Sequence, residues 1–184
     1  MVDGVVGDGV RAAPVLIVFA GLPGVGKTTL ARAVAERLGA TYLRVDTIEQ
    51  ALRDGGTLPG GVVAEGYVVA YRVAADNLAL GRSVVADLVN PLTLTRDAWR
   101  DVAATAGARL VDVEVVCSDP LEHRRRVEQR DGDIPGLVLP TWDAVRAREY
   151  DAWDRPRVVI DTAGRDVAAC VAAVLERLPA RGGA

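Results

Sequence analysis

The chain has 184 residues and a formal net charge of −3; 50% of the residues are hydrophobic and 26% are charged. These values are typical of one globular domain, exclude a disordered chain, and argue against a broad nucleic-acid surface. No early apolar run is long enough to cross a bilayer, and the opening MVDGVVGDGV lacks the basic flank of a signal peptide. We therefore expect a cytoplasmic protein with no membrane partner.

Residues 1–13 repeat glycine and aspartate without an apolar period, so we expect a flexible tail before a single domain at 14–184. From Pro14 onward, apolar segments alternate with amphipathic ones, which indicates a parallel sheet covered by helices on both faces. Strands are predicted at 15–20, 41–45, 83–86, 110–117 and 157–160. Helices are predicted at 27–38, about 62–80, 95–106, 120 to about 130, from 141 to before Pro156, and 165–178.

A phosphate-binding loop follows the first predicted strand, where GLPGVGKT matches G-x-x-x-x-G-K-[ST] and holds the only lysine of the chain, Lys27. Its glycines let backbone N–H groups converge on phosphate oxygens, and the next helix adds positive potential at its N-terminus. A compact ammonium reaches outer phosphates better than a planar guanidinium, so Lys27 is also a candidate catalytic residue. The residues expected to bind ATP are Gly21, Gly24, Val25, Gly26, Lys27, Thr28 and Thr29.

Two carboxylates are predicted beside this loop. The helix at 27–38 climbs about 17 Å at 1.5 Å per residue, and the strand after it returns about 16 Å at 3.3 Å per residue. Asp46, at the end of that strand, should therefore lie level with Lys27, where it can accept the proton of an attacking hydroxyl; alternatively, it caps the next helix. Asp87 ends the third strand and, with Thr28, is the candidate Mg²⁺ ligand, or else a turn residue.

Arginines form a further group in HRRRVEQR, where Arg126 and Arg130 share one helix face just before a proline- and glycine-rich loop. A lid at about 120–140 could bring both guanidinium groups to the transferring phosphoryl group. Arg126 is then a nucleotide-binding candidate and Arg130 a catalytic one, whereas the alternative is a solvated basic face. His123 in the same segment is expected at the surface.

Over residues 14–178 the chain resembles the small P-loop kinases of the predicted-kinase type, which include chloramphenicol phosphotransferase, the 5′-hydroxyl kinase domain of phage polynucleotide kinase, and gluconate and adenylylsulfate kinases. The likeness rests on GLPGVGKTT, RVD at 44–46, VVADLVNP at 84–91 with Arg96 and Trp99, and RRRVEQR at 124–130. It implies a P-loop NTPase fold with three layers and strand order 2-3-1-4-5. It also implies that Asp46 is the general base, that Arg126 and Arg130 touch phosphates, and that adenine binds near 161–164.

The expected function is transfer of the γ-phosphoryl group of ATP, with Mg²⁺, to a hydroxyl of a small molecule. We expect its pocket to involve residues 46–53, the 62–80 helix with Tyr67 and Tyr71, and Asn90, Arg96 and Trp99. Glu49 replaces an arginine of the polynucleotide kinase, which disfavours a nucleic-acid acceptor. An ATPase, a nucleotide-binding regulatory protein and a nucleoside or nucleic-acid 5′-hydroxyl kinase stay open, although Leu88 follows Asp87 where many ATPases carry a glutamate.

Overall fold

A computed structural model describes residues 12–56 and 64–178 of the chain. Most of the predicted N-terminal tail and the first residues of the helix predicted at 62–80 lie outside these ranges. Helices and strands alternate in the order β1 (Val15–Ala20), α1 (Lys27–Leu38), β2 (Thr41–Arg44), α2 (Val45–Asp54), α3 (Glu65–Ala79), β3 (Val84–Asp87), α4 (Thr93–Thr105), β4 (Arg109–Val116), α5 (Pro120–Gln129), α6 (Trp142–Arg146), β5 (Val158–Asp161) and α7 (Val167–Glu176).

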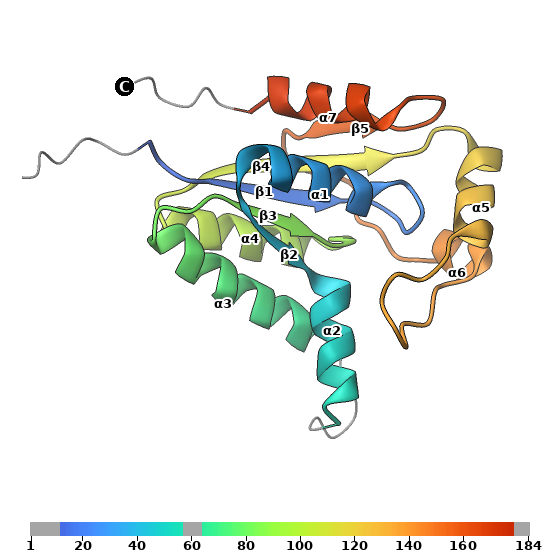
Figure 1. Ribbon diagram of the computed structural model, residues 1–184, viewed down its shortest axis with the longest axis horizontal. Coiled ribbons are helices and arrows are strands. Elements are labelled where there is room, and N and C mark those ends of the chain that lie inside the picture. The colour runs from blue at the N-terminus through green and yellow to red at the C-terminus, as the bar shows by residue number, and fades with distance from the viewer. Residues whose placement is uncertain (1–11, 57–63, 179–184) are drawn as a thin grey trace, which may run out of the picture.

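The five strands form one parallel sheet in the order β2-β3-β1-β4-β5, which confirms the predicted order (Figure 1). Asp87, the last residue of β3, pairs with Arg44 at the end of β2 and with Phe19 near the end of β1. The carboxyl ends of these three strands therefore meet at one edge of the sheet. This is the edge where open α/β folds bind their ligands.

Apolar side chains cover both faces of the sheet, because parallel strands alternate their side chains between two buried surfaces. On one face, Ile17 and Phe19 of β1 pack with residues of α1 and α7. On the other face, Leu16 and Val18 pack with residues of α3 and α4. Figure 1 shows these helix pairs on opposite sides of the sheet, which is the predicted three-layer arrangement.

Most predicted boundaries differ from the observed ones by one to three residues, and two differences bear on the site and its surroundings. β2 ends at Arg44, and α2 begins at once with Val45, so the predicted strand at 41–45 is one residue too long. The helix predicted from residue 141 to before Pro156 is only α6, which ends at Arg146. Within the described ranges 12–56 and 64–178, no helix is both long and apolar enough to span a bilayer.

Tertiary contacts explain why α6 stops early. The guanidinium group of Arg96 is fully buried and donates hydrogen bonds to the backbone oxygens of Asp151 and Ala152, at 3.1 and 3.2 Å. It also lies over the ring of Trp153, 4.0 Å from the centroid. In a helix that ended before Pro156, the Asp151 oxygen would bond to Arg155 N–H, and the Ala152 oxygen would have no internal donor because proline lacks an N–H. Arg96 therefore holds this segment as irregular chain against the start of α4.

Candidate active site

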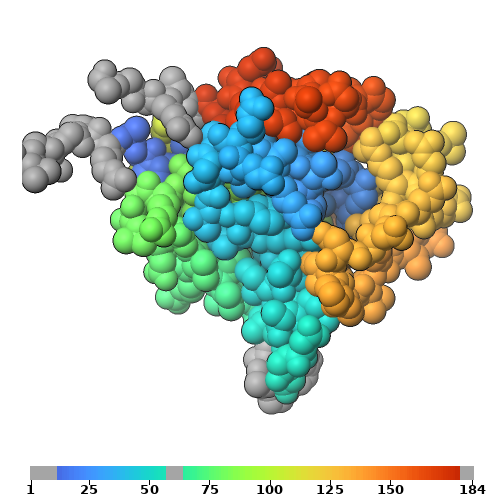
Figure 2. All heavy atoms as spheres, in the orientation of Figure 1, coloured from blue at the N-terminus to red at the C-terminus, as the bar shows by residue number. Residues whose placement is uncertain are grey.

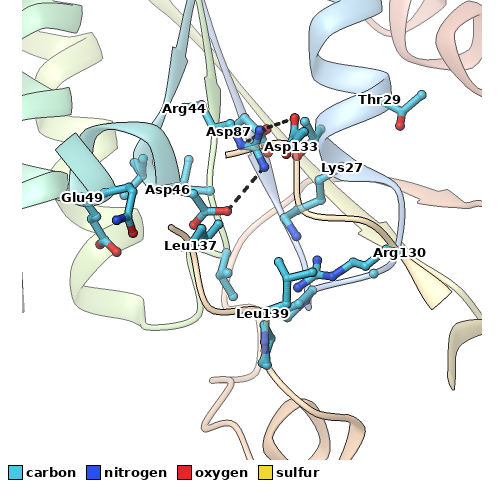
Figure 3. Close-up of a pocket in the computed structure, with 18 of the residues that line it drawn as sticks. Lys27, Thr29, Arg44, Asp46, Glu49, Asp87, Arg130, Asp133, Leu137 and Leu139 are labelled. Carbon is cyan, nitrogen blue, oxygen red and sulfur yellow. Dashed lines mark hydrogen bonds and ion pairs between the residues drawn. The ribbon is translucent and has the colours of Figure 1, made fainter. Parts of the chain in front are cut away.

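A cavity of about 1090 Å³ lies at the carboxyl edge of the sheet. Its walls come from the loop before α1, the ends of β2 and β3, one side of α2 and the segment that follows α5 (Figure 3). Lys27, Thr28, Thr29, Asp46, Asp87, Arg126 and Arg130 all line it, with Gly24 and Gly26. The fold thus brings most of the predicted site residues together, although Gly21 and Val25 lie behind this surface.

The backbone of the phosphate-binding loop depends on glycine at two positions. Gly21 has a φ of 133°, and a Cβ built there would lie under 3.0 Å from the backbone oxygen of Val115. Gly24 has a φ of 87°, and a Cβ there would come within 2.5 Å of a methyl group of Val127 on α5. The loop is therefore pressed against both β4 and α5, and its shape requires residues without side chains.

Lys27 is buried at the first position of α1, and its Nζ donates a hydrogen bond to the Leu22 backbone oxygen at 2.9 Å. Burial lowers the pKa of Lys27 to about 8, although the nearby carboxylates of Asp87 and Asp46 raise it. A bound phosphate would act in the same direction as these carboxylates and raise the pKa of Lys27, because an opposite charge favours the ammonium form. The loop carbonyl thus holds the ammonium group at the base of the cavity.

Asp46 lies in the first turn of α2 and not at the end of a strand, which corrects its predicted local context. Arg44 occupies the N-cap position without a side-chain capping bond, so the alternative that Asp46 caps this helix is wrong. The side chain of Asp46 is 46% exposed, and its recorded ion-pair partner is Arg44 at 4.0 Å. Asp46 also contributes to the pKa of Lys27, so both charges face the same part of the cavity.

Asp87 is almost fully buried at the end of β3. It accepts a hydrogen bond from the Tyr42 hydroxyl at 2.8 Å, and Arg44 Nε lies 3.9 Å away. Burial raises the pKa of Tyr42, and the neighbouring Asp87 charge adds to the effect. Tyr42 therefore stays protonated as the donor that orients this carboxylate. Sequence reasoning missed Tyr42, whose strand position alone gives no sign of this contact.

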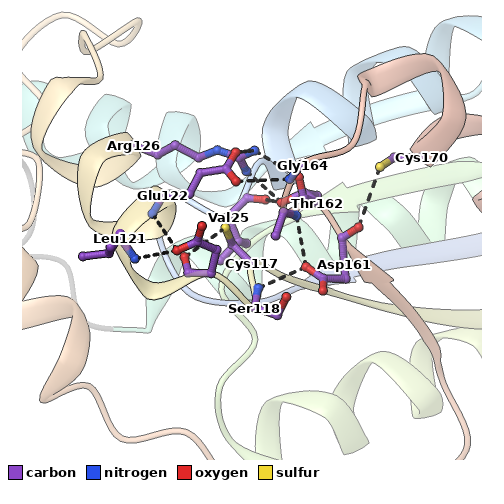
Figure 4. A network of polar contacts seen from close by, with 12 residues as sticks. Val25, Cys117, Ser118, Leu121, Glu122, Arg126, Asp161, Thr162, Gly164 and Cys170 are labelled. Atoms are coloured by element: carbon purple, nitrogen blue, oxygen red, sulfur yellow. Dashed lines mark hydrogen bonds and ion pairs between the residues drawn. The ribbon is translucent and has the colours of Figure 1, made fainter.

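Arg126 is engaged with the protein itself (Figure 4). Its guanidinium group donates to Glu122 on the previous turn of α5, to Thr162 Oγ1 at 2.7 Å and to the Thr162 backbone oxygen at 3.0 Å. The Thr162 hydroxyl in turn contacts the Val25 backbone oxygen at 2.9 Å. Arg126 thus connects α5, the loop after β5 and the phosphate-binding loop, and it reaches the cavity from this anchored position.

Arg130 is the C-cap residue after α5 and has an extended backbone, so the prediction that it shares one helix face with Arg126 is wrong. Its side chain points into the cavity near Lys27 in Figure 3. Its Nε is buried, and no partner for it exists among residues 12–56 and 64–178. Burial lowers the pKa of Arg130, while Asp46 counteracts the shift. A buried guanidinium donor without a partner is costly, so this group is suited to an anionic ligand.

The prediction for His123 is wrong, because this residue is buried rather than at the surface. Its Nε2 donates to the Pro23 backbone oxygen at 2.9 Å, and its ring packs edge-on against Trp142. His123 therefore supports the phosphate-binding loop from α5. The same helix carries Arg126, so its position relative to the loop is set by several contacts.

The segment at 130–141 closes over one side of the cavity. Asp133 accepts hydrogen bonds from Arg32 of α1 and Arg44 of β2, each at 2.7 Å. These bonds lower the pKa of Asp133 to about 2, and the bond from Arg44 has the largest effect. Partial burial of the carboxylate opposes the shift. Figure 2 shows this orange segment lying against the blue and cyan atoms of α1, β2 and α2. We call the segment 130–141 the lid.

Replacing Asp133 with asparagine should loosen the lid, because a neutral amide cannot pair with two guanidinium groups. Two exposed charge-assisted bonds contribute about 1 kcal/mol together, or roughly fivefold in the opening equilibrium. Hydrogen exchange of residues 130–141 should therefore quicken about fivefold, with α7 unchanged. In the wild type the depressed pKa keeps this stabilisation above about pH 4 and removes it as the pH falls through about 2.

Asp131→Asn is the matched control, since Asp131 makes no ion pair within the described ranges. Equal exchange rates in wild type and Asp133→Asn would show that the Asp133 bonds do not hold the lid.

The wall expected to hold the acceptor is only partly as predicted. Residues 46–53 contribute Asp46, Glu49, Gln50 and Arg53, and α3 contributes Tyr67. Arg96 and Trp99 are completely buried in the interior, so their predicted place in the pocket is wrong. Tyr71 and Asn90 also do not line the cavity. Arg32, Arg44, Asp133 and Arg148 do line it. Sequence reasoning assigned them no role, although Arg44 belongs to the RVD motif at 44–46.

Comparisons with known proteins agree with this architecture. The family described as AAA domain matches residues 16–163. An uncharacterized protein of Mycobacterium tuberculosis strain H37Rv is 33% identical over 162 residues, which cover 81% of this chain and 32% of the relative. The chain thus spans about a third of the length of the curated relatives it matches.

Two solved kinases share the fold. The Mycobacterium tuberculosis APS kinase CysC, in complex with AMPPNP and APS, has a TM-score of 0.67 and 21% identity, over 90% of this chain and 97% of that one. A gluconokinase from Sinorhizobium meliloti has a TM-score of 0.61 and 20% identity, over 90% of this chain and 92% of that one. At these identities the likeness shows the fold, and the chemistry must be argued from the site.

Proposed function

We propose, from the premise that this chain belongs to the AAA-domain family and has the fold of the small P-loop kinases, that it transfers the γ-phosphoryl group of ATP to a hydroxyl of a small molecule. One observation carries the proposal. The Asp46 carboxylate faces the cavity that Lys27 lines and makes no hydrogen bond within residues 12–56 and 64–178. A base beside the phosphate site and open to the cavity is what a hydroxyl acceptor needs.

In this mechanism the phosphate-binding loop and Lys27 hold the β- and γ-phosphates of ATP. An acceptor hydroxyl lies between Asp46 and the γ-phosphorus, and Asp46 accepts its proton as the new oxygen–phosphorus bond forms and the bond to ADP breaks. Negative charge develops on the phosphoryl oxygens, and the Arg130 guanidinium, whose Nε has no hydrogen-bond partner among the described residues, stabilises it. Closure of the lid would exclude water and suppress hydrolysis.

Mg²⁺ fits the same site. Thr28 comes directly after Lys27 in the chain, and its side chain carries a hydroxyl at the cavity. Asp87 also lines the cavity, and only one of its carboxylate oxygens accepts the hydrogen bond from Tyr42. Magnesium is commonly held by one or two protein oxygens together with phosphate oxygens and water. Thr28 and Asp87 would hold the ion, and when bound it would neutralise phosphate charge.

An ATPase without an acceptor is the main competing function. The residue after Asp87 is Leu88, and it is buried, so the position where many ATPases carry a water-activating glutamate is apolar. A regulatory nucleotide-binding protein is the other alternative, and it would bind ATP without turnover. Asp46 and the open cavity support the kinase over both alternatives.

A screen for phosphoryl acceptors tests the proposal. Purified protein with ATP and Mg²⁺ is incubated with panels of hydroxylated metabolites, nucleosides and antibiotics, and mass spectrometry detects the gain of one phosphoryl group. We expect slow ATP turnover alone and an acceptor-dependent increase with at least one panel. Rapid turnover without any acceptor and no phosphorylated product would contradict the kinase function and support the ATPase.

A further inference from the structure

Glu49 occupies the far side of the acceptor site. The charge of Asp46 affects the pKa of both Lys27 and Glu49. In Figure 3, Asp46 lies between Glu49 and Lys27. On α2, positions three residues apart share a face, so both carboxylates border the cavity. Glu49 therefore lies beyond the reacting hydroxyl, next to the rest of the acceptor.

Close helix packing fixes the position of Glu49. A Cβ built on Gly66, in the first turn of α3, would lie under 3.0 Å from Cγ of Glu49. The side chain thus rests directly on the backbone of α3, where only glycine leaves room. Arg53 donates to Oε2 of Glu49 at 3.1 Å, while Oε1 has no hydrogen-bond partner within residues 12–56 and 64–178. One carboxylate oxygen is held in place and free to accept a hydrogen bond.

Tyr67 supplies the complementary donor. Its hydroxyl oxygen accepts the backbone N–H of Asn90 at 3.3 Å, and its own proton has no acceptor within the described ranges. Burial raises the pKa of Tyr67 to about 12, so the hydroxyl stays protonated. Tyr67 lines the same cavity as Glu49. A hydroxyl group can both donate and accept a hydrogen bond. One hydroxyl group of a ligand could therefore donate to Glu49 and accept from Tyr67.

The charges at this end of the cavity balance. Arg53 pairs with Glu49, and Arg148 lies close enough to affect the pKa of both Glu49 and Tyr67. Two carboxylates, Asp46 and Glu49, thus face two guanidinium groups. An anionic acceptor would meet both carboxylates, and a cationic one would meet both arginines. Either ion would meet charges of its own sign beside any partner, and this repulsion would offset the gain from pairing.

We infer that Glu49 is a specificity-determining residue, and that the phosphoryl acceptor is a neutral polyhydroxylated molecule whose second hydroxyl donates to Glu49 and accepts from Tyr67. The inference rests on the proposed kinase function, because the bound molecule is a phosphoryl acceptor only if the protein is a kinase. Binding itself needs no phosphoryl transfer, so it can be measured separately.

Calorimetry in the presence of a non-hydrolysable ATP analogue tests the inference. Glucose, glucosamine and gluconate have the same number of carbons and differ in charge, and xylitol and myo-inositol extend the neutral class. We expect the neutral probes to bind at least tenfold tighter than glucosamine and gluconate. Tighter binding of either charged probe, or no binding of any neutral probe, would overturn the inference.

Variants at Glu49 provide the second arm. Glu49→Ala should weaken binding of the neutral probes at least tenfold, whereas Glu49→Gln, which keeps an accepting oxygen, should weaken it less than threefold. Glu176→Gln, on the exposed surface of α7, is the control. Equal losses in both Glu49 variants, or no loss in Glu49→Ala, would overturn the inference. Polyol binding without any phosphorylated product would instead contradict the kinase function and leave the binding role of Glu49 in place.

Discussion

Replacing Asp46 with asparagine is expected to lower kcat for phosphoryl transfer about 1000-fold, within the range by which a positioned general base accelerates a reaction. The amide keeps the shape of the side chain and cannot accept the proton. The affinity for ATP should change less than threefold, because Asp46 lies on α2 and not in the phosphate-binding loop. Acceptor-dependent ADP formation measures the first quantity, and calorimetry with ATP measures the second.

Asp101→Asn is the control for this substitution, since Asp101 lies exposed on α4. It should leave both quantities unchanged. An Asp46→Asn variant that retains full acceptor-dependent activity would exclude Asp46 as the base. If the variant instead shows unchanged, rapid ATP hydrolysis without an acceptor, the ATPase alternative gains the support that the kinase loses.

Replacing Gly21 with alanine should destabilise the folded protein by about 4 kcal/mol, at the upper end of single substitutions. The methyl group would meet the Val115 backbone oxygen, and the φ of 133° is strained for any residue with a Cβ. Neither β1 nor β4 can move aside, because both are central strands of the sheet. Urea unfolding measures the loss, and a reduced yield of soluble protein agrees with it.

Gly39→Ala separates the two causes of this effect. Gly39 also has a positive φ, of 62°, and no atom lies within 4 Å of a Cβ built there. This variant should lose only about 1 to 2 kcal/mol, the cost of the left-handed backbone alone. If both glycine variants lose the same free energy of unfolding, steric contact with β4 does not determine the choice of glycine at position 21.

The tertiary environment overrode the local sequence pattern at two residues, His123 and Arg96. His123 lies in a run of charged residues, a pattern that predicts a position at the surface. Its ring is nevertheless buried between the phosphate-binding loop and Trp142. Arg96 has the residue type of a ligand-binding group, yet its guanidinium is fully used on backbone oxygens in the interior. A single sequence cannot show such pairings, because Asp151 and Ala152 lie more than 50 residues from Arg96, and Pro23 lies 100 residues from His123.

The amino-acid sequence by itself determined the alternation of strands and helices and the phosphate-binding loop, because these depend on local periodicity and on glycine at fixed spacing. It also placed Asp46 level with Lys27, since the rise of a helix and a strand fixes where the chain returns. Only the tertiary structure decided that Asp46 belongs to α2, that Asp133 joins the lid to Arg32 and Arg44, and that Gly66 makes room for Glu49. These depend on contacts between segments distant in the chain, and such contacts follow from the packing of whole elements rather than from any local pattern.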